Sequence, residues 1–465
     1  MHHPGGRPGP RSRITRLTAV PAGRADPKVG VMTSSPPALR RVATAALVGT
    51  TIEYYDFFSY GTAAALVFGQ VFFPALGAAG GLLAAFSVYA VAFLARPVGA
   101  VLFGHYGDRL GRKTTLVGSL LLMGGSTALV GLLPGYGAWG IWAPVLLVSL
   151  RFCQGIGLGG EWGGAALLLA EHAPPGRRGR YGGYLQLGPC AGFFLANAVF
   201  LALSEGLSRS AFLAWGWRVP FLASAALVAF GLFVRLRVAE SPMFREQPER
   251  ARVPVVELLR EHGRTVLLGG LSVTVGYTLF YLTTTYALAY ATSELGLASG
   301  LVLGLLLAGS VVMAAMVWVS AGQGDRWGRR RTLLVTTGLA VGWALLLFPL
   351  LETARPVLVG VALIGSMAVL GLHFGPVAGY LPELFPTRLR YTGVALGYNL
   401  GGVVGGATAP LVATRLNSAY GTPVPIGWYT AGVGLVSLLS LLALPETRGR
   451  DLTAVRRAAL APEPG

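Results

Sequence analysis

The chain has 465 residues, of which 53% are hydrophobic and only 12% are charged, and its mean hydropathy is +0.61. This composition excludes an ordinary soluble globular protein. The formal net charge of +18 would suit nucleic-acid binding, so the positions of the basic residues decide what that charge means.

After a basic, Pro/Gly-rich tail at 1–38 that predicts disorder, the chain alternates between apolar runs and short polar loops. Twelve runs are long enough to cross a hydrocarbon core of roughly 30 Å as helices. The sequence therefore predicts an all-α membrane protein. The expected spans are 42–68, 80–103, 114–133, 141–171, 181–204, 217–236, 265–290, 298–321, 332–351, 357–381, 392–416 and 426–444.

The basic residues fall on one side of this array. The two tails and the even-numbered inter-span loops hold 31 of the 37 Lys and Arg residues. This is the pattern of the positive-inside rule, and it predicts that both termini lie in the cytoplasm. The positive charge therefore indicates membrane topology, and no nucleic-acid partner is expected.

A polar linker at 237–264 divides the spans into two groups of six, at 39–236 and 265–445, and a short tail at 446–465 follows. Each group carries a G/A-x-x-x-D-R-x-G-R loop after its second span and a basic loop after its fourth. Two such pairs in register predict two pseudo-symmetric six-helix bundles, with a site between them near the membrane midplane.

The loop G-x-x-x-D-R-x-G-R-K resembles the signature of the major facilitator superfamily, although the second copy has Ala321 in place of the first glycine. The stretches GTTIEYYDFFSYG (49–61), RFCQGIGLGGEWGGA (151–165) and ELFPTRLRYTG (383–393) further resemble the metabolite:H+ symporter family. That family includes permeases for alpha-ketoglutarate, citrate, shikimate and proline/betaine. The resemblance spans nearly the whole chain and implies a carrier, but it names no substrate.

Two acids and two arginines lie deep within the first, second and fourth spans. Glu53 and Arg151 are each expected roughly 15 Å from their own membrane surface, so they meet near the midplane. Asp56, three residues after Glu53, shares its helix face, and Arg96 lies nearer the cytoplasm. Charges at this depth cost ~2.5 to 3.5 kcal/mol each, which makes them candidates for function.

Fixed ion pairing is one interpretation of these charges. The interpretation that we favour is proton coupling, because a buried carboxylate can bind a proton and release it when water or an arginine arrives. Glu53 is the first candidate for this role and Glu161 the second. Arg151, assisted by Arg96, would alternate between the carboxylate and an anionic substrate.

The argument for a functional role is weaker for other polar side chains inside the spans. For Glu161, proton binding and structural ion pairing are equally well supported. His373 is better explained as a hydrogen-bonded core histidine than as a proton-coupling residue. The glycines around Glu161 predict close helix packing, and Cys153 and Cys190 are expected to be packing residues. Candidate cavity residues are Tyr54, Tyr55, Tyr60, Gln154, Tyr277, Tyr281, Tyr398 and Asn399.

The repeated loops also predict a gate at the cytoplasmic face. The resemblance implies that Asp108 and Asp325 form ion pairs across the interface between the halves, whereas the loops alone establish only a topology signal. Surface pairs contribute ~0 to 1 kcal/mol each, so several must act together. The gate candidates are Gly104, Asp108, Arg109, Gly111, Arg112, Asp325, Arg326, Arg329, Glu171 and Glu383.

The sequence thus predicts a secondary active transporter in the cell membrane that takes up a small, carboxylate-bearing metabolite with a proton. An exporter or a facilitator of the same fold is the alternative, ahead of a polytopic membrane enzyme or a receptor. No catalytic set, phosphate-binding loop or metal spacing is evident, so neither enzyme activity nor a cofactor is expected, and the protein is expected to be a monomer.

Asp108→Asn tests the gate prediction. If Asp108 helps to hold one of two transport states, the variant should transport several-fold more slowly with little change in apparent substrate affinity, as measured by initial uptake rates in proteoliposomes. Equal rates in the variant and the wild type would leave only the topology role.

Overall fold

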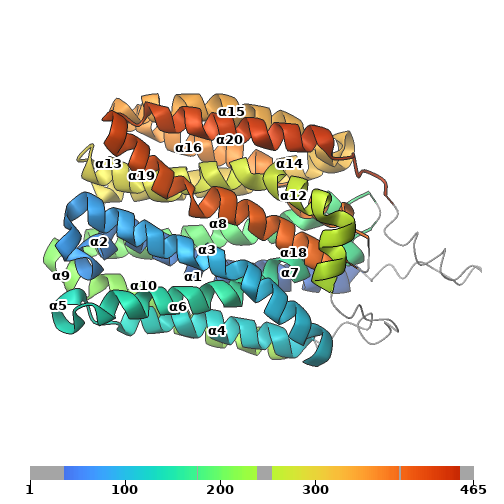
Figure 1. Ribbon diagram of the computed structural model, residues 1–465, viewed down its shortest axis with the longest axis horizontal. Coiled ribbons are helices and arrows are strands. Elements are labelled where there is room, and N and C mark those ends of the chain that lie inside the picture. Colours follow the sequence, from blue (N-terminus) through green and yellow to red (C-terminus); the bar gives the residue numbers. More distant parts are fainter. Residues whose placement is uncertain (1–35, 111, 175, 238–253, 387–388, 451–465) are drawn as a thin grey trace, which may run out of the picture.

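The computed structural model describes residues 36–110, 112–174, 176–237, 254–386 and 389–450. This part of the chain is helical, with short connections and no strand (Figure 1). The all-α prediction is therefore confirmed.

The first half contains α1 (Pro36–Ala63), η1 (Ala64–Phe68), α2 (Gly69–Phe72), η2 (Pro74–Leu76), α3 (Gly77–Leu110), α4 (Arg112–Leu132), α5 (Tyr136–Trp139), α6 (Trp142–Gly159), α7 (Glu161–His172), α8 (Arg178–Gly206), α9 (Arg209–Ala214), η3 (Gly216–Arg218) and α10 (Val219–Arg237). The second half contains α12 (Pro254–Tyr281), η4 (Leu282–Tyr286), α13 (Ala287–Ser293), α14 (Ser299–Trp327), α15 (Arg329–Glu352), α16 (Pro356–Phe374), α17 (Val377–Glu383), α18 (Arg390–Gly401), η5 (Gly402–Ala407), α19 (Ala409–Tyr420) and α20 (Val424–Ala443).

Nine helical segments in the described residues are long and apolar enough to cross a membrane. The three other expected spans are also helical. They are α1 with η1, α4, and the run of α18, η5 and α19. The buried acids of α1 and the π-helical segment η5 show why apolarity alone does not identify every span, because these helices carry charged or irregular positions within their length.

The two halves repeat one packing scheme. In the first half α1 packs on α8, α3 on α6 and α4 on α10, and in the second half α12 packs on α18, α14 on α16 and α15 on α20. The repeat extends to local geometry, because α1 and α12 each continue into a π-helical segment. Such π segments are frequent at functional sites.

The helices run between two ends of the molecule. One end, called the basic end here, carries the end of α7, the start of α8, the turn between α14 and α15, the end of α17 and the start of α18 (Figure 1). The other end, called the opposite end, carries α2, α5, α9 and α13 (Figure 1). Helices from both halves meet along the length between them, where α8 packs on α14 and α3 on η5 and α18.

Glycines bring α6 against α3. A Cβ atom at Gly155 would overlap the backbone carbonyl of Ala92, and one at Gly159 would overlap the carbonyl of Arg96. The predicted close packing at these two glycines is confirmed. It matters for the site because Arg96 and Arg151 lie on these two helices.

Gly159→Leu should therefore be severely destabilising, since the side chain must push two helix backbones apart. We expect a loss of at least ~1 to 3 kcal/mol, read as a lower melting temperature of the purified protein in detergent. Gly125→Leu on α4 is the matched control, because a Cβ there meets nothing within 4 Å. An unchanged melting temperature for Gly159→Leu would contradict the packing.

Candidate functional site

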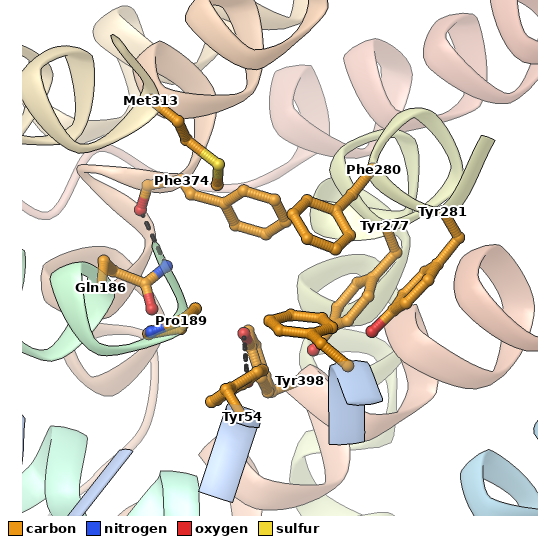
Figure 2. Close-up of a pocket in the computed structure, with 10 residues that line it drawn as sticks. Tyr54, Gln186, Pro189, Tyr277, Phe280, Tyr281, Met313, Phe374 and Tyr398 are labelled. Atoms are coloured by element: carbon orange, nitrogen blue, oxygen red, sulfur yellow. Dashed lines mark hydrogen bonds between the residues drawn. The ribbon is translucent and has the colours of Figure 1, made fainter. Parts of the chain in front are cut away.

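A small cavity lies between the two halves (Figure 2). Both halves contribute, and aromatic side chains form most of its wall. The lining residues are Tyr54, Phe58, Gln186, Pro189, Tyr277, Phe280, Tyr281, Met313, Phe374 and Tyr398. The predicted cavity residues Tyr54, Tyr277, Tyr281 and Tyr398 are thus brought together here.

In this conformation the cavity is too small for a metabolite. Its volume of about 30 Å³ holds only one or two water molecules, whereas ligand sites occupy roughly 300 to 1,000 Å³. Two hydrogen bonds cross it between the halves, from Gln186 Nε2 to the carbonyl of Phe374 (3.0 Å) and between the hydroxyls of Tyr54 and Tyr398 (3.3 Å) (Figure 2). A metabolite can enter only if the halves move apart.

Arg96 lies beside this cavity and is 2% exposed. Its guanidinium stacks on the rings of Phe57 and Phe93, each 4.3 Å from the ring centre, and its charge acts on the nearby Tyr281. Cation–π contacts of this kind stabilise a desolvated cation by up to about 2 kcal/mol. They leave its net positive charge in place.

Arg151 is fully buried next to Arg96, close enough for the two charges to repel. Its guanidinium lies 3.8 Å from the ring centre of Tyr60 and donates to Gln154 Oε1. Among the described residues, no carboxylate lies within ion-pair distance of either guanidinium. Two adjacent buried cations are therefore held by aromatic rings and by one amide oxygen.

A series of buried polar groups lies between Arg151 and Asp56 in the interior of the first half. Gln154 Nε2 donates to Thr127 Oγ1 (2.7 Å), and the Thr127 hydroxyl donates to the carbonyl of Met123 (2.9 Å). Thr127 and Ser224 are near enough to Asp56 to act on its carboxylate, but neither is hydrogen-bonded to it. Asp56 is fully buried and points toward α4 and α10, whereas Tyr54 on the same helix points into the cavity. No direct contact joins Asp56 to Arg151, and Thr127 and Gln154 are the groups that lie between them.

Glu53 is also buried, at 1% exposure, and its charge acts on Asp56. The direct Glu53–Arg151 pairing that we expected is not made in this conformation. The depth estimate placed both at the midplane, but it carried no information on rotation about the helix axes, and Arg151 turns toward Tyr60 and Gln154.

A second set of contacts joins the halves on the basic side of the cavity. The rings of Trp162 and Tyr398 are stacked with centres 3.5 Å apart. Asn399 Nδ2 donates to the carbonyl of Gly159 (3.0 Å), and the Tyr391 hydroxyl donates to that of Gly160 (2.5 Å). Asn399 therefore ties α18 to α6 rather than lining the cavity.

Three residues predicted for a gate, Asp325, Arg329 and Glu383, lie together at the basic end. Asp325 accepts hydrogen bonds from the backbone N–H groups of Gly179 and Arg180, at the start of α8 in the other half (both 2.9 Å). Arg329 pairs with Asp325 (3.0 Å) and Glu383 (2.8 Å), both in its own half. The contact that Asp325 makes across the halves is thus to a helix N-terminus, where a negative charge is favourable, and not to an opposing arginine.

The backbone conformation explains why the loop motif has a glycine at position 328. Its φ of +106° lies in the left-handed region, and a Cβ there would approach Glu446 Oε2 at 2.5 Å. Glu446 accepts from the N–H groups of Arg329 (2.9 Å) and Arg330 (3.1 Å), and so caps α15. The turn therefore fixes Arg329 between its two acidic partners.

The remaining candidates lie apart from the cavity or outside the description. His373 is fully buried within the second half, 3.3 Å from the Thr337 hydroxyl, and is not among the lining residues. Glu161 is buried at the first position of α7, and Arg326 is exposed. The surroundings of six gate candidates are not described, so the structure does not test their predicted role. These are Gly104, Asp108, Arg109, Gly111, Arg112 and Glu171.

Sequence reasoning missed Thr127, Gln186, Trp162 and the phenylalanines that enclose the arginines. Thr127 and Gln186 are single polar residues in apolar helices, the same signal that identified Gln154. No sequence signal separates Phe57 or Phe93 from the many aromatic residues that simply face lipid.

Comparisons with known proteins agree with this architecture. The family model of the Major Facilitator Superfamily matches residues 46–410. The chain is 45% identical to the inner membrane metabolite transport protein YhjE of Escherichia coli (strain K12), over 89% of this chain and 95% of that one. It is 37% identical to the shikimate transporter of the same organism, over 88% and 95%, and 32% identical to its proline/betaine transporter, over 90% and 86%.

Among solved structures, the fold is similar to that of the proton:xylose symporter XylE bound to 6-bromo-6-deoxy-D-glucose. The TM-score is 0.72 at 17% identity, with 90% of this chain and 98% of that chain covered. The likeness concerns the twelve-helix fold.

Asp325→Asn should loosen the basic end, because charge-assisted bonds contribute about 1.5 to 3 kcal/mol. Opening of the basic end can be measured with a single reporter cysteine in a background in which Cys153 and Cys190 are replaced. The reporter is placed at Ala378, which is buried and packs on Gly182 of the other half. We expect it to react with maleimide several-fold faster in Asp325→Asn and at the wild-type rate in the control Arg326→Gln. Equal rates in all three would show that Asp325 does not hold the halves together.

Proposed function

Because the chain belongs to the major facilitator superfamily and is a membrane transporter, we propose that it takes up a small carboxylate-bearing metabolite together with a proton. The two halves alternate access to a central site. In the proposed orientation, both termini and the basic end face the cytoplasm, and the protein acts as a monomer in the cell membrane.

The observation that carries the proposal is the pair of buried arginines in a first half that also buries carboxylates. Arg96 and Arg151 repel each other and have no carboxylate partner among the described residues. A substrate carboxylate placed between them supplies the missing negative charge and can accept paired hydrogen bonds from a guanidinium. Substrate binding therefore lowers the electrostatic cost of this part of the interior.

The names of the relatives support the same class of substrate. They include transporters of shikimate and of proline or betaine, and each of these molecules carries a carboxylate. The aromatic wall of the cavity suits a compact solute whose remaining surface is apolar, cationic or hydroxylated. Tyr54, Tyr277, Tyr281 and Tyr398 provide hydroxyl groups for specific contacts.

Asp56 is the proton site that the geometry favours, with Glu53 as its neighbour. A proton on Asp56 removes the free-energy cost of a carboxylate that is 0% exposed. The Thr127 hydroxyl has one proton, which it donates here to the carbonyl of Met123 (2.9 Å). A charged Asp56 nearby would compete for that proton. Proton binding at Asp56 thus changes the bonding of Thr127, Gln154 and finally Arg151.

This chain of contacts supplies the coupling. With Asp56 charged, Thr127 is drawn toward the acid, and Gln154, which bonds both Thr127 and Arg151, is drawn with it. With Asp56 neutral, Thr127 is released to Met123, and Arg151 is free to settle on a substrate carboxylate. Proton and substrate together then favour the occluded form that can reorient.

Asp56→Asn tests the coupling. This variant mimics the protonated acid, so accumulation of substrate driven by a pH gradient should fall to the background level, while exchange of labelled for unlabelled substrate continues. Glu53→Gln should behave in the same way if the two acids act as one unit. Both activities are measured in proteoliposomes with radiolabelled dicarboxylates, shikimate-like acids and betaines.

The control is Glu294→Gln, which neutralises an exposed acid at the opposite end and should leave accumulation unchanged. Accumulation at the wild-type level in Asp56→Asn and in Glu53→Gln would remove both acids from the mechanism. Loss of binding in Arg151→Gln for neutral as well as anionic solutes would contradict the anion role of Arg151.

A further inference from the structure

A groove separate from the central cavity lies between the two halves at the opposite end. It has a volume of about 440 Å³ and runs between α3 of the first half and α19 of the second, which pack against each other. Its wall consists of Leu83, Ser87, Leu411, Val412, Arg415, Leu416 and Ala419. Five of these side chains are aliphatic, and one is a cation.

Exposed aromatic residues at the helix ends indicate where the groove lies relative to the membrane surface. Trp and Tyr side chains collect where lipid meets water. At the opposite end, the exposed members of this set are Trp139, Trp142, Trp215, Tyr420 and Trp428. Tyr420 is the last residue of α19, so this helix ends at the level of the lipid headgroups.

The groove is polar near that level and apolar below it. Arg415 lies five residues before Tyr420, roughly 7 Å below it along the helix, and its long side chain can reach back toward the headgroups. Leu411 lies nine residues before Tyr420, roughly 13 Å below it, and Leu83 stands six residues into α3. The aliphatic part of the wall thus faces the hydrocarbon layer.

Arg415 is exposed and makes no hydrogen bond or ion pair with any described residue. Two other arginines at the opposite end are engaged, since Arg209 donates to the carbonyl of Leu66 and Arg218 to that of Leu133. A cation at headgroup level above an apolar groove matches one ligand in both charge and shape.

We propose that this groove binds a glycerophospholipid, with the phosphate on Arg415 and an acyl chain along Leu83, Leu411, Val412 and Leu416. In the orientation proposed above, this lipid belongs to the outer leaflet. Because the walls come from both halves, the lipid binds best at one separation of α3 and α19, and so favours one transport state over the other.

The groove is distinct from the path of the transported solute. Its walls carry one charged and one hydroxyl side chain, whereas the central cavity is lined by tyrosines beside two arginines. A small carboxylate on Arg415 would leave the aliphatic walls without a partner, and a lipid covers both.

Native mass spectrometry of the full-length protein with added phosphatidylglycerol tests the site directly. We expect Arg415→Gln to lower the bound lipid about tenfold at a fixed lipid concentration, and Ser87→Phe, which fills the groove from α3, to lower it similarly. Arg355→Gln is the matched control, because Arg355 is also an exposed arginine at the opposite end. It should retain lipid at the wild-type level.

A competition experiment distinguishes a lipid phosphate from free phosphate as the group bound by Arg415. Inorganic phosphate is added at the same concentration as the lipid headgroup. Failure of phosphate to displace the lipid supports a phospholipid site, and equal displacement overturns it, as does wild-type lipid retention in Arg415→Gln. Melting temperatures confirm that each variant is folded. This readout does not depend on transport, so it stands or falls separately from the proposed proton coupling.

Discussion

The cost of placing charge in a low-dielectric interior governs the centre of this protein. Arg96 and Arg151 are both within 2% of complete burial, and yet neither meets an acid in the described residues. Aromatic faces, and for Arg151 a hydrogen bond to Gln154, keep them in place without neutralising them. An interior that retains unneutralised positive charge is the basis of the proposal that the substrate is an anion.

The acids of the same half are kept apart from these cations by one layer of neutral polar groups. Thr127 and Gln154 stand between Asp56 and Arg151, so the two charges influence each other without forming a fixed pair. A direct ion pair would satisfy both partners permanently and would hold the protein in one state. The indirect connection leaves each end able to respond to its own ligand.

Much of the fold follows from the sequence, because span length, hydropathy and the sidedness of Lys and Arg are properties of the chain alone. Close packing at Gly155 and Gly159 was equally readable, since a small residue every fourth position has one main use in membrane helices. The partners of Arg151 were not readable. Depth along a helix follows from counting residues, but rotation about the helix axis depends on tertiary packing. The side chain of Arg151 therefore contacts Gln154 and Tyr60, and not Glu53 as expected.

The stack of Trp162 on Tyr398 spans the boundary between the halves, with ring centres 3.5 Å apart. Such a pair contributes about 0.5 to 1.5 kcal/mol beyond the area it buries, and this contact must be broken before the basic side can open. Indole emission depends on the polarity around the ring and on quenching by neighbours. If the halves separate at this contact during transport, one indole among nine passes from a dry, stacked environment to a hydrated one, and its fluorescence then reports that step.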